Sequence, residues 1–263
     1  MGKSIGILSV KGGVGKTSSV IALGDAFSKF GKKVLLVDAN FSAPNLGVHL
    51  NIIEPKKTAH HVLNRTASFK DAIQKMDNFD VLPSSMFEDI LISPIELRKK
   101  LGMVKGKYDF VIIDSSPSLS EETIGALIAS DEVFIVTTPD YPTLSMTLKT
   151  IKLARKRGIP INGLILNKVH GRDFELSIDN IEKTAEVPVL AVIPYDTNIL
   201  ESVSEFTPSV TFNPYSRASN EYMKLAAILS GKKHNPFSIR RFMGITPKKQ
   251  DINRDIFYES YFK

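Results

Sequence analysis

The feature that most constrains the fold is the run of residues 11–17, in which three of the seven residues are glycine. Residues 4–10 before it are apolar and β-rich, as in a buried strand, and residues 18–30 after it repeat apolar positions at helical spacing. Glycines at such a junction allow positive φ angles, so that successive amide N–H groups can surround phosphate oxygens at the start of the helix. The run therefore predicts a phosphate-binding loop in an α/β fold.

Two polar side chains of this loop complete the prediction. Lys16 can reach the β- and γ-phosphates of a nucleotide, and the Thr17 hydroxyl can coordinate Mg²⁺. A lysine and a threonine directly after the last glycine are a more specific signal than the glycines alone. We expect these residues to contact the nucleotide: Lys11, Gly12, Gly13, Val14, Gly15, Lys16, Thr17 and Ser18.

Short apolar runs alternate with longer amphipathic stretches as far as residue 231. The expected strands are 4–10, 34–37, 79–82, 110–113, 133–137, 164–166 and 189–193. The expected helices are 18–30, 94–103, 120–129, 143–156, 176–184 and 216–229. This rhythm predicts a doubly wound, mostly parallel sheet of about eight strands with helices on both faces, as in P-loop NTPases. Residues 50–105 carry few further signals.

Composition narrows the function classes. The chain has no cysteine, which excludes disulfides, cysteine-bound zinc and iron–sulfur clusters. No apolar run reaches the roughly 18 residues of a membrane span and no signal peptide is recognisable, so a cytoplasmic protein is expected. Residues 232–263 hold eight Lys or Arg and three Asp or Glu (+5), which leaves +1 of the net +6 for residues 1–231. We therefore expect an ATPase domain at 1–231 and a basic tail at 232–263.

The loop departs from the general P-loop pattern, because Val10 occupies the first glycine position and Lys11 precedes the glycines. This form resembles the MinD/ParA family of ATPases, most closely the archaeal MinD-like proteins. The resemblance implies Mg-ATP as the ligand and an ATP-bound homodimer, in which Lys11 reaches the nucleotide of the other subunit. A solvated loop lysine is the alternative for Lys11.

The segment after the second strand resembles the first switch region of that family. The resemblance implies that Asp38 binds the Mg²⁺ shell and that a second acid, two residues later, positions the attacking water. This chain has Asn40 there, and an amide can orient a water but cannot accept its proton. The implied catalytic residues are Lys11, Lys16, Asp38 and Asn40, with slow hydrolysis. In isolation, an ordinary turn also explains Asn40, Pro44 and Asn45.

Residues 108–117 contain the apolar strand 110–113, which is followed directly by the carboxylate of Asp114. This is the Walker B arrangement. Asp114 is the expected partner of Mg²⁺ through water, together with Thr17 and Asp38. The following serines, residues 115–118, resemble the second switch region, where the γ-phosphate is sensed.

The base-binding end of the site is predicted from two further strand ends. Asn167 matches the asparagine that hydrogen-bonds adenine in the family. A guanine site of the Asn-Lys-x-Asp type needs an acid where this chain has His170, so ATP is favoured. Pro194, in the run 193–196, resembles the loop that packs on the other side of the base, although a plain turn explains that run almost as well.

The tail leaves alternatives open. Residues 236–243 predict a short basic amphipathic helix, because three apolar residues share one face with Arg240 and Arg241 turned away. In MinD-like proteins such a helix binds anionic membrane, which implies peripheral binding through 236–245 at the inner face of the cell membrane. Residues 251–263 add six apolar side chains without a clean stripe, so packing of the tail on the body or on a second subunit is the alternative. DNA or a protein partner is a third.

We interpret the chain as a MinD/ParA-type switch that dimerises with ATP and positions or regulates a protein partner at the membrane. The rival with the same fold is a DNA-associated partitioning ATPase. A rival of another class is an ATP-dependent metabolic enzyme, but no additional catalytic cluster is found. The iron–sulfur scaffold ATPases share the loop, but this chain lacks their cysteines.

Overall fold

Eight strands form one sheet in the order β3-β4-β2-β5-β1-β6-β7-β8 in the computed structural model, which describes residues 2–87, 93–232 and 248–262. The strands are β1 (Lys3–Leu8), β2 (Val34–Ala39), β3 (Gln74–Lys75), β4 (Asp80–Leu82), β5 (Phe110–Ser115), β6 (Glu132–Thr137), β7 (Ile161–Val169) and β8 (Val189–Pro194). All neighbours are parallel except the short edge pair β3–β4, which is antiparallel.

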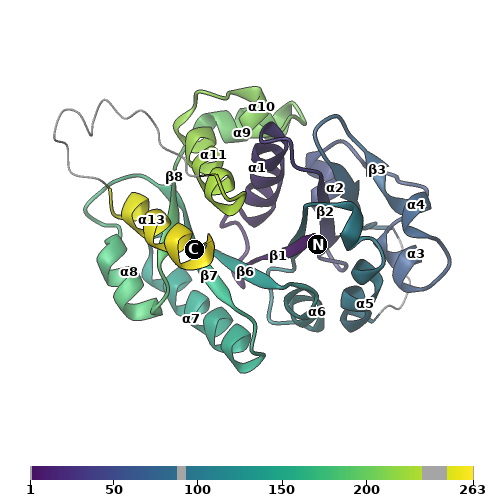
Figure 1. The fold of residues 1–263 in the computed structure, drawn as a ribbon, viewed down its shortest axis with the longest axis horizontal. Coiled ribbons are helices and arrows are strands. Elements are labelled where there is room, and N and C mark those ends of the chain that lie inside the picture. The colour runs from purple at the N-terminus through teal and green to yellow at the C-terminus, as the bar shows by residue number, and fades with distance from the viewer. Residues whose placement is uncertain (1, 88–92, 233–247, 263) are drawn as a thin grey trace.

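Helices cover both faces of this sheet, with α1, α9, α10 and α11 on one side and α5, α6, α7 and α8 on the other (Figure 1). The longer ones are α1 (Lys16–Lys29), α6 (Glu121–Ala129), α7 (Tyr141–Lys156), α8 (Ile178–Ala185), α9 (Thr197–Ser204), α11 (Arg217–Leu229) and α13 (Lys249–Phe262). The shorter ones are α2 (Leu46–His49), α3 (Ala59–Leu63), α4 (Phe69–Ala72), α5 (Leu97–Gly102) and α10 (Ser209–Phe212), with 3-10 turns at Pro94–Glu96 and Lys105–Lys107.

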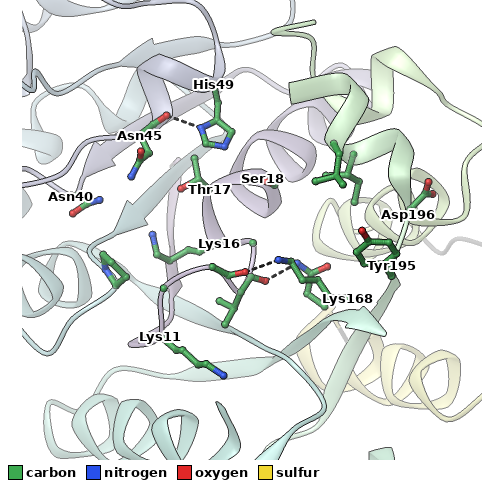
Figure 2. Close-up of a pocket in the computed structure, with 18 of the residues that line it drawn as sticks. Lys11, Lys16, Thr17, Ser18, Asn40, Asn45, His49, Lys168, Tyr195 and Asp196 are labelled. Atoms are coloured by element: carbon green, nitrogen blue, oxygen red, sulfur yellow. Dashed lines mark hydrogen bonds between the residues drawn. The ribbon is translucent and has the colours of Figure 1, made fainter. Parts of the chain in front are cut away.

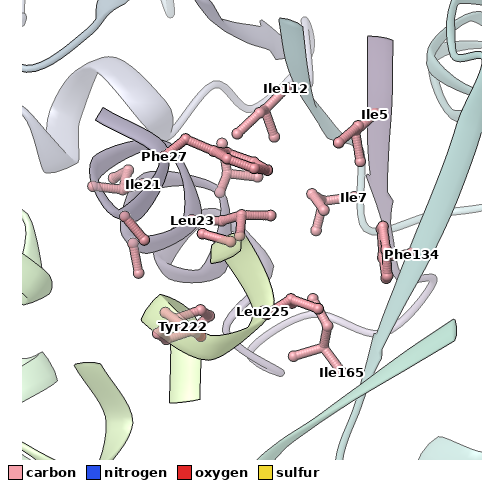
Figure 3. Packing of buried hydrophobic residues seen from close by; sticks show 14 of the residues in the cluster. Ile5, Ile7, Ile21, Leu23, Phe27, Ile112, Phe134, Ile165, Tyr222 and Leu225 are labelled. Atoms are coloured by element: carbon pink, nitrogen blue, oxygen red, sulfur yellow. The ribbon is translucent and has the colours of Figure 1, made fainter. Parts of the chain in front are cut away.

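Apolar runs become central parallel strands because both faces of the sheet are buried. Along β2, for example, Leu36 packs against the α1 side while Leu35 and Val37 pack against the α6 side. Figure 3 shows the α1 side of the core, where Phe27 lies among strand residues and Tyr222 approaches from α11. The ring of Phe27 stacks on that of Phe110 at 4.0 Å. This packing fixes α1, and with it the loop that precedes α1.

The predicted fold class is confirmed: the sheet is mostly parallel, has eight strands and carries helices on both faces. Boundaries differ by a few residues, since β1 ends at Leu8 rather than at residue 10 and the expected helix 94–103 is a 3-10 turn followed by α5. Residues 50–105, where the sequence offered few signals, contain three short helices and the edge strands β3 and β4. The chain bends there too often for a long periodic pattern to form.

The described end of the tail is the helix α13, which packs on β8 and α11. Arg254 is buried and donates to the carbonyl oxygen of Leu190 at 2.8 Å and to Glu221 at 2.9 Å. Asn253 donates to the carbonyl oxygen of Val189 at 2.9 Å. Side chains of α13 thus satisfy backbone groups of the edge strand, which protects that edge from pairing with other chains. The amphipathic helix expected at 236–243 lies outside the described residues.

Candidate functional site

A cavity of about 430 Å³ lies where several strands reach their carboxyl ends, which is the usual ligand position in open α/β sheets (Figure 2). Its lining comes from the loop 11–18, the β2–α2 loop, the end of β7 and the β8–α9 turn. The residues are Lys11, Gly12, Gly13, Val14, Gly15, Lys16, Thr17, Ser18, Asn40, Asn45, His49, Pro117, Asn167, Lys168, Pro194, Tyr195, Asp196, Ile199 and Leu200.

The backbone conformation of the loop requires glycine at two positions. Gly13 has φ 77° and Gly15 has φ 88°, in the left-handed region that glycine occupies without strain. A Cβ atom on Gly15 would also lie 2.2 Å from the side-chain nitrogen of Asn167. Gly15 ends the loop as the N-cap of α1, so the open N-terminus of that helix faces the cavity and favours an anion there.

Beneath the loop, Lys16 and Thr17 both contact Asp114 at the end of β5. The Lys16 ammonium donates to one carboxylate oxygen at 2.6 Å, and the Thr17 hydroxyl donates to the other at 2.7 Å. Lys16 and Thr17 follow β1, whereas Asp114 lies near the end of β5. These residues meet because β1 and β5 are adjacent parallel strands. The predicted Walker B carboxylate therefore lies next to the predicted phosphate-binding lysine and magnesium-binding threonine.

Asp38 is the second buried carboxylate at this end of the sheet, and it pairs in register with Asp114 on the adjacent strand. It accepts backbone N–H bonds from Asn40 and Leu46, both at 3.1 Å. Burial, and then the negative charge of Asp114, raise the pKa of Asp38 to about 8. Two carboxylates that share one buried lysine suit an additional cation, and Mg²⁺ is usually held through one or two carboxylates plus phosphate oxygens. The residues therefore fit magnesium.

Asn40 follows β2 and is almost fully buried at the wall of the cavity. Its amide nitrogen donates to the carbonyl oxygen of Ala43, while its amide oxygen has no hydrogen-bond partner among the described residues. The same loop is tied to α6, because the Ser42 backbone and hydroxyl both donate to Glu122. An acceptor without a partner at this position can orient a donor such as water.

Lys11 lies on the far side of the loop from Lys16, and the two ammonium groups point in different directions (Figure 2). The Lys11 ammonium donates to the Thr143 hydroxyl at 2.5 Å and lies 3.3 Å from the carboxylate of Asp140, the N-cap of α7. The Lys11 and Asp140 side chains are each 41% exposed. Lys11 is therefore held by its own chain at the rim of the cavity.

The opposite end of the cavity has the shape and chemistry of a base-binding subsite. Asn167 donates its amide N–H to the carbonyl oxygen of Val14 at 2.7 Å, which leaves its amide oxygen as an acceptor. An acceptor matches the exocyclic amine of adenine, whereas guanine presents an oxygen at that position. Pro194 and Tyr195 line the same end, and the ring of Tyr195 stacks on that of His170 at 4.8 Å.

The structure brings most of the predicted site residues to one cavity, with Asp38 and Asp114 just below its floor. Sequence reasoning missed His49, Lys168, Tyr195, Ile199 and Leu200 in the lining, and Asp140 as the partner of Lys11. Lys168 and Tyr195 lie in the runs 164–168 and 193–196, which were already predicted to contact the base. Their position at strand ends was therefore a signal that they line the site. The sequence contains no signal for Asp140 and Leu200, because their positions depend on where α7 and α9 begin.

Comparisons with known proteins agree with this geometry. A family model described as an AAA domain matches residues 2–162. An uncharacterized ATP-binding protein of Methanocaldococcus jannaschii is 36% identical over 231 residues, covering 86% of this chain and 88% of that protein. The sporulation initiation inhibitor protein Soj of Bacillus subtilis is 32% identical over 247 residues, covering 86% of this chain and 97% of Soj. The septum site-determining protein MinD of Pyrococcus horikoshii, solved with Mg-ADP, matches at 31% identity and a TM-score of 0.80, covering 91% of this chain and 99% of MinD.

Proposed function

This chain belongs to the MinD/ParA family of P-loop ATPases, and from this premise we propose that it is an ATP-controlled switch. It binds Mg-ATP, pairs with a second copy of itself while ATP is bound, and returns to the unpaired state after slow hydrolysis. The observation that carries the proposal is the contact of Lys16 and Thr17 with Asp114 beneath a loop that opens onto a cavity. This arrangement places a cation, a hydroxyl and a carboxylate together where a polyphosphate fits.

Each residue of the site has a distinct proposed role. Amide N–H groups of residues 12–17 bind the phosphates, and Lys16 neutralises the β- and γ-phosphates. Thr17, Asp38 and Asp114 hold Mg²⁺, which supplies charge stabilisation at the phosphate oxygens when bound. Asn167 and Pro194 contact the adenine, and Asn40 orients the attacking water.

The proposed homodimer is supported by the surface around the cavity. Three large apolar side chains close in sequence to site residues are exposed: Leu200 lines the cavity, Leu119 follows Pro117 by two residues, and Tyr141 follows Asp140, the partner of Lys11. Large exposed apolar side chains are common in protein interaction surfaces. Lys11 lies at this rim with its ammonium directed away from its own cavity, as a residue that contacts a partner's phosphates requires.

Replacing Asn40 with aspartate is expected to speed ATP turnover by about tenfold, less than the roughly 10² to 10⁴ that a general base typically contributes. The gain is limited because phosphoryl transfer depends mainly on positioning and charge stabilisation, and a third carboxylate near Asp38 and Asp114 adds repulsion. The new carboxylate would also face the Ala43 carbonyl oxygen, so the apo protein should unfold at a lower temperature. Steady-state ATPase assays and thermal denaturation measure both effects.

Two controls distinguish a missing base from other causes. Asn40→Ala removes the orienting amide and should slow turnover, whereas Asp38→Asn should abolish it by weakening the magnesium site. If Asn40→Asp is neutral or slower while Asp38→Asn is inactive, Asp38 alone matters and Asn40 does not limit the rate.

We propose that the ATPase domain, residues 1–231, positions a partner at the cell membrane, with the tail at 232–263 as the contact. No helix in the ranges 2–87, 93–232 and 248–262 is long and apolar enough to cross a bilayer, so the proposal concerns surface binding. The tail accounts for +5 of the net charge of +6, and each Lys or Arg near an anionic surface contributes about 1 kcal/mol. The described end of the tail, α13, is anchored on β8 and α11 through Arg254.

Replacing Arg240 and Arg241 together with alanine should reduce ATP-dependent binding to anionic vesicles by about 30-fold, since two charges are lost. ATP affinity should stay unchanged. The matched control is Lys152→Ala with Lys156→Ala, two exposed lysines of α7. Vesicle sedimentation with and without ATP measures the effect. An equal loss of vesicle binding in both double variants would contradict the proposal that the tail is the membrane contact.

Sedimentation with vesicles and with duplex DNA, each with and without ATP, also tests the rival function. A DNA-associated partitioning ATPase would bind duplex DNA in a salt-dependent manner and leave vesicles unbound. An ATP-dependent metabolic enzyme would instead turn over ATP only with a small-molecule substrate.

A further inference from the structure

Three consecutive carbonyl oxygens of the phosphate-binding loop each accept a hydrogen bond from a side chain. The ammonium of Lys168 donates to Gly13 at 2.7 Å, the amide of Asn167 donates to Val14 at 2.7 Å, and the hydroxyl of Ser19 donates to Gly15 at 2.8 Å. Figure 2 shows Lys168 reaching the loop from the end of β7. The contacts of Asn167 and Lys168 cross more than 150 residues of sequence.

These bonds determine where the loop amides point. A peptide unit is planar and trans, so its C=O and N–H point in opposite directions. Holding the carbonyls of residues 13, 14 and 15 toward these donors therefore turns the N–H groups of residues 14, 15 and 16 to the opposite side of the loop. Those are the groups that a phosphate-binding nest needs.

Lys168 adopts a strained backbone to make its bond. Its φ is 55°, in the left-handed region that is sterically unfavourable for a residue with a Cβ atom. The register of β7 against β8 also shifts between Leu166 and Val169, so the strand is irregular where Lys168 lies. Such irregularities at strand ends re-aim side chains. A strained residue that persists beside a binding cavity indicates a function for its conformation.

We propose that Lys168 is a positioning residue of the nucleotide site, which aligns the loop amides for phosphate through the carbonyl of Gly13. The role rests on the proposed function, because it presumes that the loop holds a polyphosphate. Asn167 performs the same task on Val14 while its amide oxygen serves the base. Lys168 also adds a positive charge to the lining of the cavity, which further favours a polyanion there.

The test separates the effect of the Lys168 ammonium from the effect of its left-handed backbone. Lys168→Gly removes the ammonium but relieves the left-handed strain, so the variant should be at least as heat-stable as the wild type. It should bind both Mg-ATP and Mg-tripolyphosphate about tenfold more weakly by titration calorimetry, since one charge-assisted bond to the loop is lost. Lys168→Arg, which keeps a donor of similar reach, should retain most of the affinity.

A control variant matches the change in charge and in backbone. Arg65 is also exposed and also has a left-handed φ, 62°, but lies after α3 and outside the lining of the cavity. Arg65→Gly should therefore leave both affinities unchanged. In the ligand-free protein, the amides of residues 14–16 should exchange hydrogen faster in Lys168→Gly than in the wild type or in Arg65→Gly.

The outcomes decide between the alternatives. An equal loss of ATP and tripolyphosphate affinity supports the positioning role. A loss for ATP alone would mean that Lys168 contacts the nucleoside directly, and no loss for either ligand would mean that its bond is incidental; both overturn the proposal. A wild-type protein that binds neither ligand would overturn the proposed function itself.

Discussion

Replacing Lys16 with alanine is expected to weaken ATP binding about 1000-fold, a loss of roughly 4 kcal/mol. The ammonium of Lys16 lies beneath the loop and against the buried carboxylate of Asp114. Charge-assisted bonds to two phosphates disappear together in this variant, and the remaining loop amides are dipoles rather than full charges. Titration calorimetry with ATP measures the effect.

The same substitution should also change the protein without nucleotide. Asp114 is 1% exposed and loses its cation in Lys16→Ala, and removing one partner of a buried ion pair typically costs about 3–5 kcal/mol. We therefore expect a lower unfolding temperature. Adding Asp114→Asn to the variant removes the orphaned charge while keeping an acceptor for Thr17, so the double variant should regain stability.

This double variant makes the site assignment testable. It should fold as well as the wild type and still fail to bind ATP, because it lacks both the phosphate-facing cation and Asp114, a proposed magnesium ligand. Asp114→Asn alone, which keeps Lys16, separates these two contributions. Lys33→Ala, at an exposed lysine beyond the other end of α1, is the control and should change neither quantity. Wild-type ATP affinity in the stable double variant would contradict the role of Lys16.

Much of the fold followed from local sequence patterns. The glycine loop between an apolar run and a helical run predicted the β1–loop–α1 unit, and carboxylates at the ends of two apolar runs predicted where Asp38 and Asp114 would lie. Both inferences work because parallel strands place their carboxyl ends at one edge of the sheet. The β2–β5 register, which pairs Asp38 with Asp114, could not be read from spacing but follows once both strands are central.

Other features depend on contacts between distant segments. Nothing near Lys168 in the sequence predicts a left-handed backbone or a bond to Gly13, because both arise from the irregular pairing of β7 with β8. The anchoring of α13 is similar. Its apolar residues form no clean stripe, since the buried face includes the charged Arg254, which finds its partners on β8 and α11.

Replacing Lys11 with alanine is expected to leave ATP binding nearly unchanged and to weaken the ATP-bound homodimer by about 100-fold to 10,000-fold. A symmetric dimer loses two such lysines at once, and each charge-assisted contact to a partner's phosphates contributes roughly 1.5–3 kcal/mol. Lys11 can be removed without disturbing the loop because its side chain points to α7 rather than into its own cavity. Light scattering with a non-hydrolysable ATP analogue measures the dimer.

Changing Asp140, which pairs with Lys11 in the same chain, should have the opposite effect on the dimer. For Lys11 to reach another subunit, its contacts with Asp140 and Thr143 must open, and an exposed ion pair of this kind holds it by only about 0.2–1 kcal/mol. Asp140→Asn keeps an acceptor for the Thr143 N–H at the start of α7 but removes the charge, so Lys11 is released while the helix cap is preserved. This variant should dimerise as well as the wild type or up to about fivefold more tightly. In the Lys11→Ala background the same change should have no effect on dimerisation. Normal dimerisation of Lys11→Ala would mean that Lys11 serves only its own chain, and the ion pair with Asp140 would then be its whole role.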